Sequence, residues 1–288
     1  MTDYGHELRF GTFITPSSAH VAEVVRLARL SDRLGYDLIS FQDHPYQPAL
    51  LDAPTLLAYL AAQTEHAHLS ANVTNLPLRQ PVVIARSAVT LDLLSAGRFE
   101  LGIGAGGFWD AIAAVGGRRL RPGQAVDALE EAIRIIREIW DVGEPGGVRV
   151  EGEYYRVVGA KRGPAAAHDI GISIGAYKPR MLRLTGRVAD GWLPSLGYLE
   201  SPSALGGLNE LIDEGAESAG RAPTDIRRWL NIGAAGSSRE WAEQLAAMTL
   251  DYGMSGFILG SDDQIVIERF AHEVAPAVRE LVAAARHD

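Results

Sequence analysis

Residues 69–103 read LSANVTNLPLRQPVVIARSAVTLDLLSAGRFELGI and contain the pattern that decides the fold. The run at 69–75 is short, carries apolar Leu69, Ala71 and Val73, and ends before Pro77, which is typical of a strand. Residues 82–95 carry apolar side chains at helical spacing, and Gly97 follows where that helix would end. A second strand is predicted at 99–103. Strand, helix and strand in succession are the repeating unit of a parallel sheet.

The same alternation continues in both directions along the chain. Further strands are predicted at 8–14, 37–41, 170–174, 191–194, 226–232 and 256–259. Further helices are predicted from Val21 towards Gly35 and at 54–64, 179–189, 205–219, 238–252 and 263–285, the last with a kink at Pro276. Eight strand–helix units in 288 residues favour a closed (β/α)8 TIM barrel over an open, doubly wound sheet. We expect residues 1–288 to form one such barrel domain.

Two segments interrupt the alternation. Residues 104–123 are rich in glycine, and residues 108–110 do not open a clear helix; the fourth helix follows, with apolar residues from Leu129 to Trp140 on one face. Residues 148–158 are β-branched and aromatic around a Glu-Gly pair, which predicts a small hairpin inserted between that helix and the strand at 170–174.

Composition limits the classes of function. The chain has no cysteine, which excludes a disulfide framework, a thiolate nucleophile and an iron–sulfur cluster. A net charge of −9 disfavours a nucleic-acid partner, because phosphate contacts need a basic surface. No apolar run approaches the roughly 18 residues of a membrane-spanning helix, and the N-terminus lacks the basic region and apolar core of a signal peptide. We therefore expect a cytoplasmic protein without a membrane partner.

The strand ends hold the candidate catalytic residues, because the active site of such a barrel lies at the C-terminal ends of its strands. Asp43-His44-Pro45 follows the strand at 37–41. A histidine with a near-neutral pKa can take or give a proton there, and the adjacent carboxylate can orient a ring or bind a polar group. The structural alternative is a histidine that only fixes the turn before Pro45. The position at the catalytic face favours the functional interpretation.

Two other strand ends carry glycine. GIGAGG at 102–107 matches the GxGxxG pattern of dinucleotide sites but lies in the fourth unit, so we interpret its glycines as room for a flat ring or phosphate to approach the backbone. The alternative is a merely flexible loop. GAYKPR at 175–180 begins a helix, where free N–H groups with Lys178 and Arg180 would bind a phosphate. The alternative is a pair of solvated surface cations.

Other histidine and tryptophan residues of the chain are weaker indications of a binding site. His66 and His68 have an HxH spacing, but no third ligand stands near them in sequence, so we interpret them as part of a solvated turn and predict no metal. Trp109 and Trp192 lie at predicted strand ends, where they would wall a pocket for a ring.

Taken in order, these residues resemble the bacterial luciferase-like family of flavin- and deazaflavin-dependent oxidoreductases. The resemblance covers nearly the whole chain, and the set of motifs is more specific than any one of them. The matching stretches are FGTFITP (10–16), GYDLISFQDHP (35–45), ANVTNLPLRQPVVIARSAVTLDLLSAGRFELGIGAG (71–106), EGEYYRV (151–157), IGAYKPRMLRLTGRVADGWLPS (174–195) and RFAHEVAPAVRE (269–280).

The resemblance implies a barrel that binds the deazaflavin coenzyme F420 or FMN in its mouth. It places Asp43 and His44, our candidate catalytic residues, where they face the ring and the substrate. It also implies a non-prolyl cis peptide between Asn72 and Val73, a polar contact from Asn75 and a phosphate-binding turn at 175–178. With the strand-end glycines, the candidate cofactor-binding residues are Asn72, Val73, Asn75, Gly104, Ala105, Gly106, Gly175, Ala176, Tyr177, Lys178 and Arg180.

Two departures from the family pattern favour F420 over FMN. Ala105 stands where FMN-binding members often have an arginine, and Gln42-Asp43-His44 replaces the glutamate and paired histidines of the luciferases. We predict an oxidoreductase in which F420 accepts or donates a hydride and His44 moves the paired proton on a small organic substrate. The chain is short for the family, so we expect a small lid after the strand at 226–232.

Three alternatives stay open. One is an FMN-dependent monooxygenase of the same family, and another is a barrel that binds flavin without turnover, as a carrier or sensor. The third is an unrelated barrel enzyme such as an aldolase or isomerase, which strand-end lysines or a carboxylate cluster would favour. Besides its small-molecule substrate, we expect a second copy of the chain as a partner, in a homodimer.

Overall fold

The strands close into a parallel barrel. The computed structural model describes residues 3–287, so the first two residues and the last residue of the expected domain lie outside it. The barrel strands are β1 (Arg9–Phe13), β2 (Leu38–Phe41), β3 (His68–Ala71), β4 (Thr74–Asn75), β5 (Phe99–Gly104), β8 (Ile172–Ile174), β9 (Gly191–Trp192), β10 (Arg227–Ile232) and β11 (Gly256–Gly260). Their order is β3-β2-β1-β11-β10-β9-β8-β5-β4, and a further β3–β5 pairing closes the ring.

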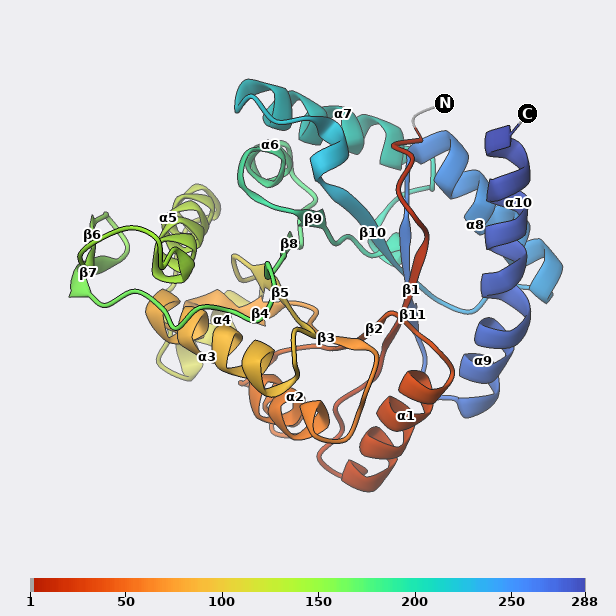
Figure 1. The fold of residues 1–288 in the computed structure, drawn as a ribbon, viewed down its shortest axis with the longest axis horizontal. Coiled ribbons are helices and arrows are strands. Elements are labelled where there is room, and N and C mark those ends of the chain that lie inside the picture. The colour runs from red at the N-terminus through yellow and green to blue at the C-terminus, as the bar shows by residue number, and fades with distance from the viewer. Residues whose placement is uncertain (1–2, 288) are drawn as a thin grey trace.

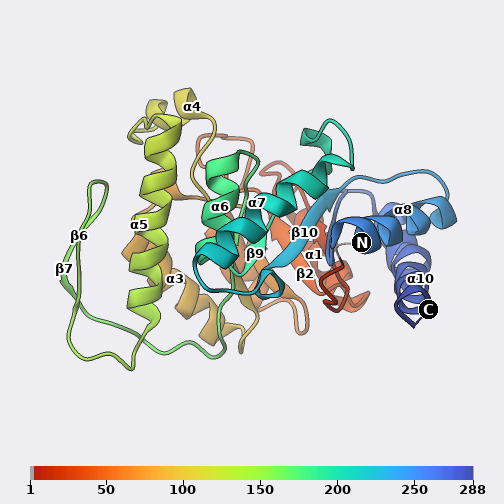
Figure 2. The ribbon, with the colours of Figure 1, turned by 90° about the horizontal axis from the view of Figure 1, so that it is seen from above.

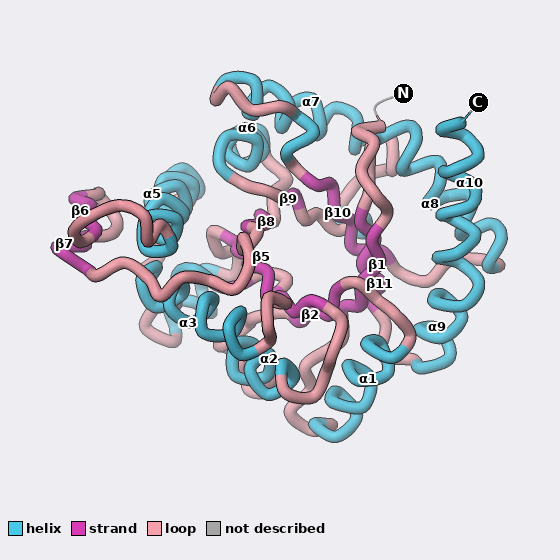
Figure 3. Tube along the Cα trace, in the orientation of Figure 1, coloured by secondary structure: helices cyan, strands magenta, loops and turns pink. Residues whose placement is uncertain are grey.

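The helices surround this ring. They are α1 (Val21–Arg33), α2 (Ala53–Ala61), α3 (Pro81–Leu94), α4 (Trp109–Ala114), α5 (Pro122–Trp140), α6 (Pro179–Val188), α7 (Ala204–Ser218), α8 (Ser238–Tyr252), α9 (Gln264–Arg269) and α10 (Ala275–His287). Figures 1 and 3 show the strands at the centre with the helices outside them. Because β4 continues the course of β3, the ring has eight strand positions, and the predicted (β/α)8 TIM barrel is confirmed.

The strand expected at 69–75 is interrupted. β3 ends at Ala71, β4 pairs separately with β5, and the peptide bond between Asn72 and Val73 in the gap is cis, as the resemblance implied. The expectation of no clear helix after Phe108 was wrong, because α4 begins at Trp109.

The last helix is divided rather than simply kinked. Residues 270–274 form a π-helical turn between α9 and α10. Pro276 lies two residues beyond it and has no N–H to donate to the carbonyl of His272, so a regular α-helical ladder cannot run through this point.

The predicted hairpin is present, formed by β6 (Val148–Glu151) and β7 (Arg156–Ala160), which pair antiparallel. Figure 2 shows it outside α5. The Glu131 carboxylate of α5 accepts the backbone N–H groups of residues 153–155 and so fixes the hairpin turn to that helix.

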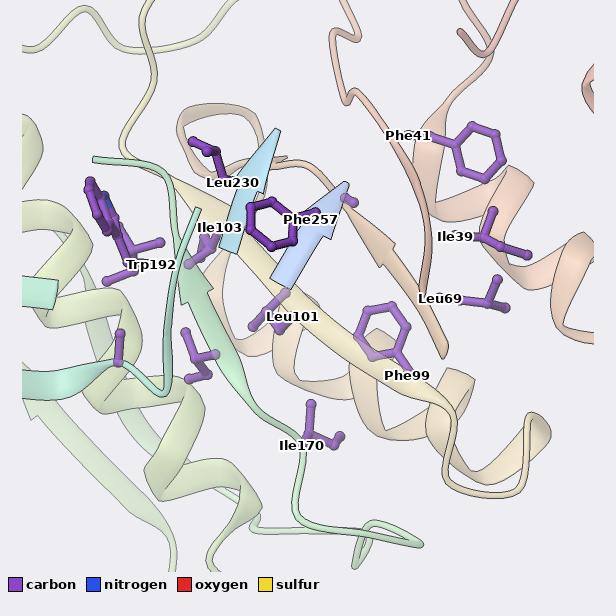
Figure 4. Close-up of a cluster of buried hydrophobic side chains, with 14 of the residues drawn as sticks. Ile39, Phe41, Leu69, Phe99, Leu101, Ile103, Ile170, Trp192, Leu230 and Phe257 are labelled. Carbon is purple, nitrogen blue, oxygen red and sulfur yellow. The ribbon is translucent and has the colours of Figure 1, made fainter. Parts of the chain in front are cut away.

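Two apolar clusters fill the molecule. The larger lies between the strands and the helices, and Figure 4 shows part of it, with outward-facing residues such as Leu69, Leu101 and Phe257. The smaller lies on the inward face of the strands and consists of Leu38, Leu193, Trp229 and Ile258, with Phe13 and Val73 packed against it.

Glycine makes room for Trp229 inside the barrel. A Cβ built on Gly256 would lie 2.1 Å from an atom of the Trp229 ring, whereas one on Gly191 would lie 2.3 Å from Ser173 Oγ and only in ordinary contact, at 3.4 Å, with Trp229. Interiors are close-packed, so one large indole in a narrow ring requires neighbours without side chains. The barrel is therefore filled at its centre, and a ligand can enter only near its ends.

We predict opposite effects for two glycine-to-alanine changes. Gly256→Ala should lower the free energy of unfolding by about 1–3 kcal/mol or more, because the new methyl group collides with the buried Trp229 ring. Gly207→Ala, at an exposed position of α7 with open space around it, should raise that free energy by roughly 0.5–1 kcal/mol through helix propensity. Urea denaturation measures both, and a Gly256→Ala protein as stable as wild type would contradict the packing argument.

Candidate active site

A pocket of about 420 Å³ opens at the C-terminal ends of the barrel strands. Its volume lies in the usual range of small-molecule sites. It brings together most of the sequence-predicted site residues: Asp43, His44, Asn72, Val73, Asn75, Gly104, Ala105, Gly106, Gly175 and Tyr177. Ala176, Lys178 and Arg180 are not among its lining residues. The lining residues that the sequence prediction did not select are Phe13, Gln42, Tyr46, Thr74, Gly107, Phe108, Met181, Leu193, Ser195, Tyr198 and Asn231.

The Asp43 carboxylate is fully engaged beneath the pocket. Its side chain is 0% exposed, and it accepts the backbone N–H of Asn75 at 2.9 Å. The Arg79 guanidinium donates to both carboxylate oxygens, at 2.9 and 3.2 Å, and also to Asp52 at 2.8 Å. Burial disfavours the charged guanidinium, but the bonds to Asp43 and Asp52 outweigh burial and raise the pKa of Arg79. Asp43 therefore has a permanent counter-ion.

The His44 imidazole has a different environment. Its ring stacks on Tyr46 with centroids 5.4 Å apart, and Phe108 meets it edge-on, also at 5.4 Å. Within residues 3–287, no group donates a hydrogen bond to the imidazole or accepts one from it. Burial lowers the pKa of His44 below its ordinary 6.5, and the nearby Asp43 charge offsets part of that effect. At neutral pH the ring is uncharged and has a free lone pair to accept a proton.

Three asparagines supply amide groups to the pocket. Asn72 Nδ2 donates to Asn231 Oδ1 at 2.6 Å, and Asn231 Nδ2 donates in turn to the Pro194 carbonyl at 3.2 Å. Asn75 is 7% exposed, and its Oδ1 is buried without a hydrogen-bond partner in the described chain. A buried acceptor left unpaired costs stability, so this atom is well placed for a donor on a bound molecule.

Val73 forms part of the pocket floor. A Cβ built on Gly104 would lie 2.6 Å from Val73 Cγ2, and one on Gly175 would lie 3.6 Å from it. Gly104 is therefore required by the Val73 side chain rather than by a ring or phosphate, which refines the interpretation of the glycine-rich strand end. Gly107 has open space around its Cα and leaves that part of the wall accessible.

The aromatic walls differ from those expected. Trp192 is 0% exposed, and its indole N–H donates outside the pocket to the Ala176 carbonyl. Trp109 packs against Gly106 and the main core. The prediction that these two tryptophans wall the pocket was wrong. That position is occupied by tyrosines and phenylalanine instead, namely Tyr46, Phe108, Tyr177 and Tyr198. The Phe108 and Tyr198 rings are exposed at the rim, and Tyr46 and Tyr177 are half-buried.

The proposed phosphate turn lies at the pocket edge, where Lys178 caps α6 and Pro179 is its first residue. Arg180 is paired with Asp127 and donates to the Gly123 carbonyl at 3.1 Å, so its charge is already balanced. Lys178 is exposed, and no ion pair engages it within the described residues. Of the two cations, Lys178 is the one available to an anion.

Fold and pocket together define a class: a (β/α)8 barrel whose mouth has an apolar floor, aromatic walls and the imidazole of His44, which is unpaired among residues 3–287. The sequence model of the luciferase-like monooxygenase family matches residues 7–287, and the chain belongs to that family. The family expected from the sequence motifs is thus confirmed.

Named relatives of this chain use coenzyme F420. An F420-dependent glucose-6-phosphate dehydrogenase of Microbacterium testaceum is 29% identical, over 96% of this chain and 90% of the relative. The enzyme of the same name from Mycolicibacterium gilvum is 31% identical, over 78% of this chain and 68% of the relative. An F420-dependent secondary alcohol dehydrogenase, solved with an F420–acetone adduct, has the same fold with a TM-score of 0.82 at 18% identity, covering 95% of this chain and 99% of its own.

We predict that Arg79 is required for stability. Arg79→Ala leaves the buried Asp43 carboxylate without its counter-ion and should lower the free energy of unfolding by about 3 kcal/mol. The double variant Asp43→Asn/Arg79→Ala should regain part of that loss, because it buries no charge. Arg239→Ala, which breaks a surface pair with Glu243, is the control and should change little. Denaturant unfolding tests the set, and a stable Arg79→Ala single variant would contradict the assignment.

Proposed function

We propose that this protein is an F420-dependent oxidoreductase that transfers a hydride between the coenzyme and an uncharged hydroxyl or carbonyl compound. The observation that carries the proposal is the unbonded His44 imidazole, whose pKa burial lowers, in a pocket where Asp43, held by Arg79, is the only lining carboxylate among residues 3–287. The F420-dependent relatives support the same chemistry.

The pocket residues fit a flavin-type ring. Such a ring carries N–H donors and carbonyl acceptors along one edge, and the unpartnered Oδ1 of Asn75 would accept from a donor there. Val73 and Leu193 offer an apolar surface to a ring face. When bound, F420 supplies the ring carbon that accepts or releases the hydride.

His44 moves the proton that accompanies the hydride. In the oxidative direction, the substrate carbon gives up its hydride and the substrate hydroxyl gives its proton to the neutral imidazole, which leaves a carbonyl compound. In reduction, protonated His44 returns that proton to the new alkoxide. Asp43 acts as a positioning residue, because its bonds to Arg79 and the Asn75 backbone fix the turn that presents His44.

The charge of the residues that line the pocket limits the charge of the substrate that can bind. The lining residues include no lysine and no arginine among residues 3–287. A sugar phosphate would bring a dianion into a half-buried site without a cation to pair with it, which is costly. We therefore propose an unphosphorylated substrate, in contrast to the glucose 6-phosphate named for the relatives.

Ala105 at the end of β5 favours F420 over FMN. It offers no cation to a phosphate inside the pocket, so the anionic tail of the coenzyme would reach Lys178 and the free N–H groups of α6 outside it. The loop between β10 and α8 consists of residues 233–237. The lid that we expected at this loop is therefore small, and it would leave the pocket open for such a tail.

The oligomeric state and the cellular location that we propose are those expected from the sequence. We propose that the chain works in the cytoplasm as a homodimer, each copy forming one barrel domain. No helix among the described residues is long and apolar enough to span a membrane. Sedimentation analysis of the purified protein tests the dimer.

Titration with F420 and with FMN, followed by fluorescence, tests the cofactor. We expect F420 to bind at least tenfold more tightly. Lys178→Ala should weaken F420 binding more at low salt than at high salt, because an exposed charge is screened by salt. Arg180→Ala is the matched control, since its charge is paired with Asp127. Tighter FMN binding with oxygen consumption would establish the monooxygenase alternative, and unchanged F420 affinity in Lys178→Ala would reject the tail site.

Replacement of His44 tests the catalytic group. With F420 and a panel of small alcohols, His44→Ala should lower turnover by about 10²–10⁴-fold, the usual contribution of a general base, while F420 affinity stays nearly unchanged. Wild-type alcohol oxidation should fall only as the pH drops below 6.5, because burial keeps His44 neutral above that value. His66→Ala, an exposed histidine outside the pocket, is the control. Near-wild-type turnover in a folded His44→Ala protein would remove His44 from the mechanism.

A further inference from the structure

A second cluster of ionisable side chains lies at the opposite end of the barrel. His68 is the first residue of β3, Glu100 is the second residue of β5, and His168 lies just before β8. These strands are neighbours in the ring, with β5 between the other two. Because all of them are parallel, the three side chains gather at the N-terminal end, away from the active-site pocket. One potential ligand atom from each residue lies within 4.8 Å of the other two.

The spacing of these atoms matches a tetrahedral metal site. Glu100 Oε1 lies 3.0 Å from His68 Nδ1 and 3.5 Å from His168 Nε2. Ligand atoms bound to Zn²⁺ at about 2.0–2.1 Å in a tetrahedron lie roughly 3.3 Å from one another. These two distances bracket that value, and the third pair, His68 and His168, lies within 4.8 Å. A bound ion would replace the hydrogen bond between His68 and Glu100.

Asp92 prepares His168 to be a ligand. His168 Nδ1 lies 2.6 Å from the fully buried Asp92 carboxylate, which also accepts the backbone N–H groups of Ala167 and His168. The hydrogen bond between Nδ1 and Asp92 fixes the ring so that Nε2 of His168 points towards Glu100 Oε1, 3.5 Å away. A carboxylate that fixes the far nitrogen of a histidine ligand is the usual second layer of a zinc site.

One ring nitrogen of the cluster lacks a partner in the described chain and is placed to bind a ligand. His168 Nε2 is buried and has no hydrogen-bond partner among residues 3–287. The unpartnered Nε2 lies 3.5 Å from Glu100 Oε1, where a bound cation would join the two atoms. The second oxygen of Glu100 accepts the Gly171 N–H at 2.9 Å, so Oε1, hydrogen-bonded to His68 Nδ1 at 3.0 Å, is the oxygen that faces the two histidines.

We propose that His68, Glu100 and His168 bind a Zn²⁺ ion at the N-terminal end of the barrel. Two imidazoles and one carboxylate suit Zn²⁺ and disfavour Mg²⁺ and Ca²⁺, which prefer sets of oxygen ligands. The three side chains are 30%, 26% and 26% exposed, so an ion can reach them and a water can fill a fourth position. The ion clamps β3, β5 and the segment before β8 together, which is a structural role distinct from the chemistry at the other end.

This proposal replaces the sequence-based expectation of no metal. The HxH spacing drew attention to His66 and His68, but His66 is exposed and lies outside the cluster. The remaining ligands come from positions far along the chain, which only the closed barrel brings near His68.

Calorimetric titration of chelator-treated protein with ZnCl2 tests the site. We expect one Zn²⁺ per chain with micromolar or tighter affinity, and a rise in Tm of about 3 °C or more with saturating Zn²⁺. His168→Ala and Glu100→Gln should each weaken binding at least tenfold. Asp92→Asn should weaken it by about 10–100-fold. His66→Ala is the matched control and should bind Zn²⁺ as wild type does.

Co²⁺ gives a second readout in folded protein. Bound in place of Zn²⁺, it should produce the intense visible absorption of a four-coordinate ion, and Glu100→Gln, which keeps the size of the side chain, should abolish that band. Absence of stoichiometric Zn²⁺ binding to wild type would overturn the proposal. Equal affinity in wild type, His168→Ala and Glu100→Gln would overturn it too, and loss of binding in His66→Ala would assign the metal to the HxH pair instead.

Discussion

The buried Asp43 carboxylate is the group on which the geometry of the active site depends. It receives the Asn75 N–H from β4 and the guanidinium of Arg79, and so joins the end of β2 to the chain that follows the Asn72–Val73 cis bond. A carboxylate taken out of water is stable only with a close counter-ion and good hydrogen bonds, and Asp43 has both. His44 is the next residue, so the bonds that hold Asp43 also set the direction of the imidazole.

The two ends of the barrel carry different kinds of ionisable groups. At the C-terminal end, the His44 imidazole has no hydrogen-bond partner in the described part of the chain and faces aromatic rings, an environment suited to proton transfer. At the N-terminal end, the His68, Glu100 and His168 side chains are tied to one another and to Asp92, an arrangement suited to holding strands together. Trp229 occupies the space between them, with room left for its ring by Gly256, so neither end opens into the other.

Much of the fold could be predicted because its signals are local. The spacing of apolar residues and a glycine or proline at the boundary predict each strand–helix unit. The features that these signals did not predict are short, such as α4 and the π-helical turn at 270–274. The site was less predictable. Asp43 and His44 follow from their place at a strand end, but the partner that neutralises Asp43 is Arg79, more than thirty residues further on. Trp192 was assigned to the pocket from its strand-end position, yet the alternation of side chains along β9 turns it outward into the core.

The most direct test of this account is the pKa of His44 in the free protein, measured by an NMR titration of the ring and assigned with a His44→Gln variant. If Asp43 is held by Arg79 and burial dominates at His44, the pKa lies below 6.5, and Asp43→Asn lowers it further by removing the one nearby negative charge. A pKa well above 6.5 that falls sharply in Asp43→Asn would mean that Asp43 and His44 form an ion pair of their own. That result would contradict the assignment of Asp43 as a positioning residue and of neutral His44 as the proton acceptor.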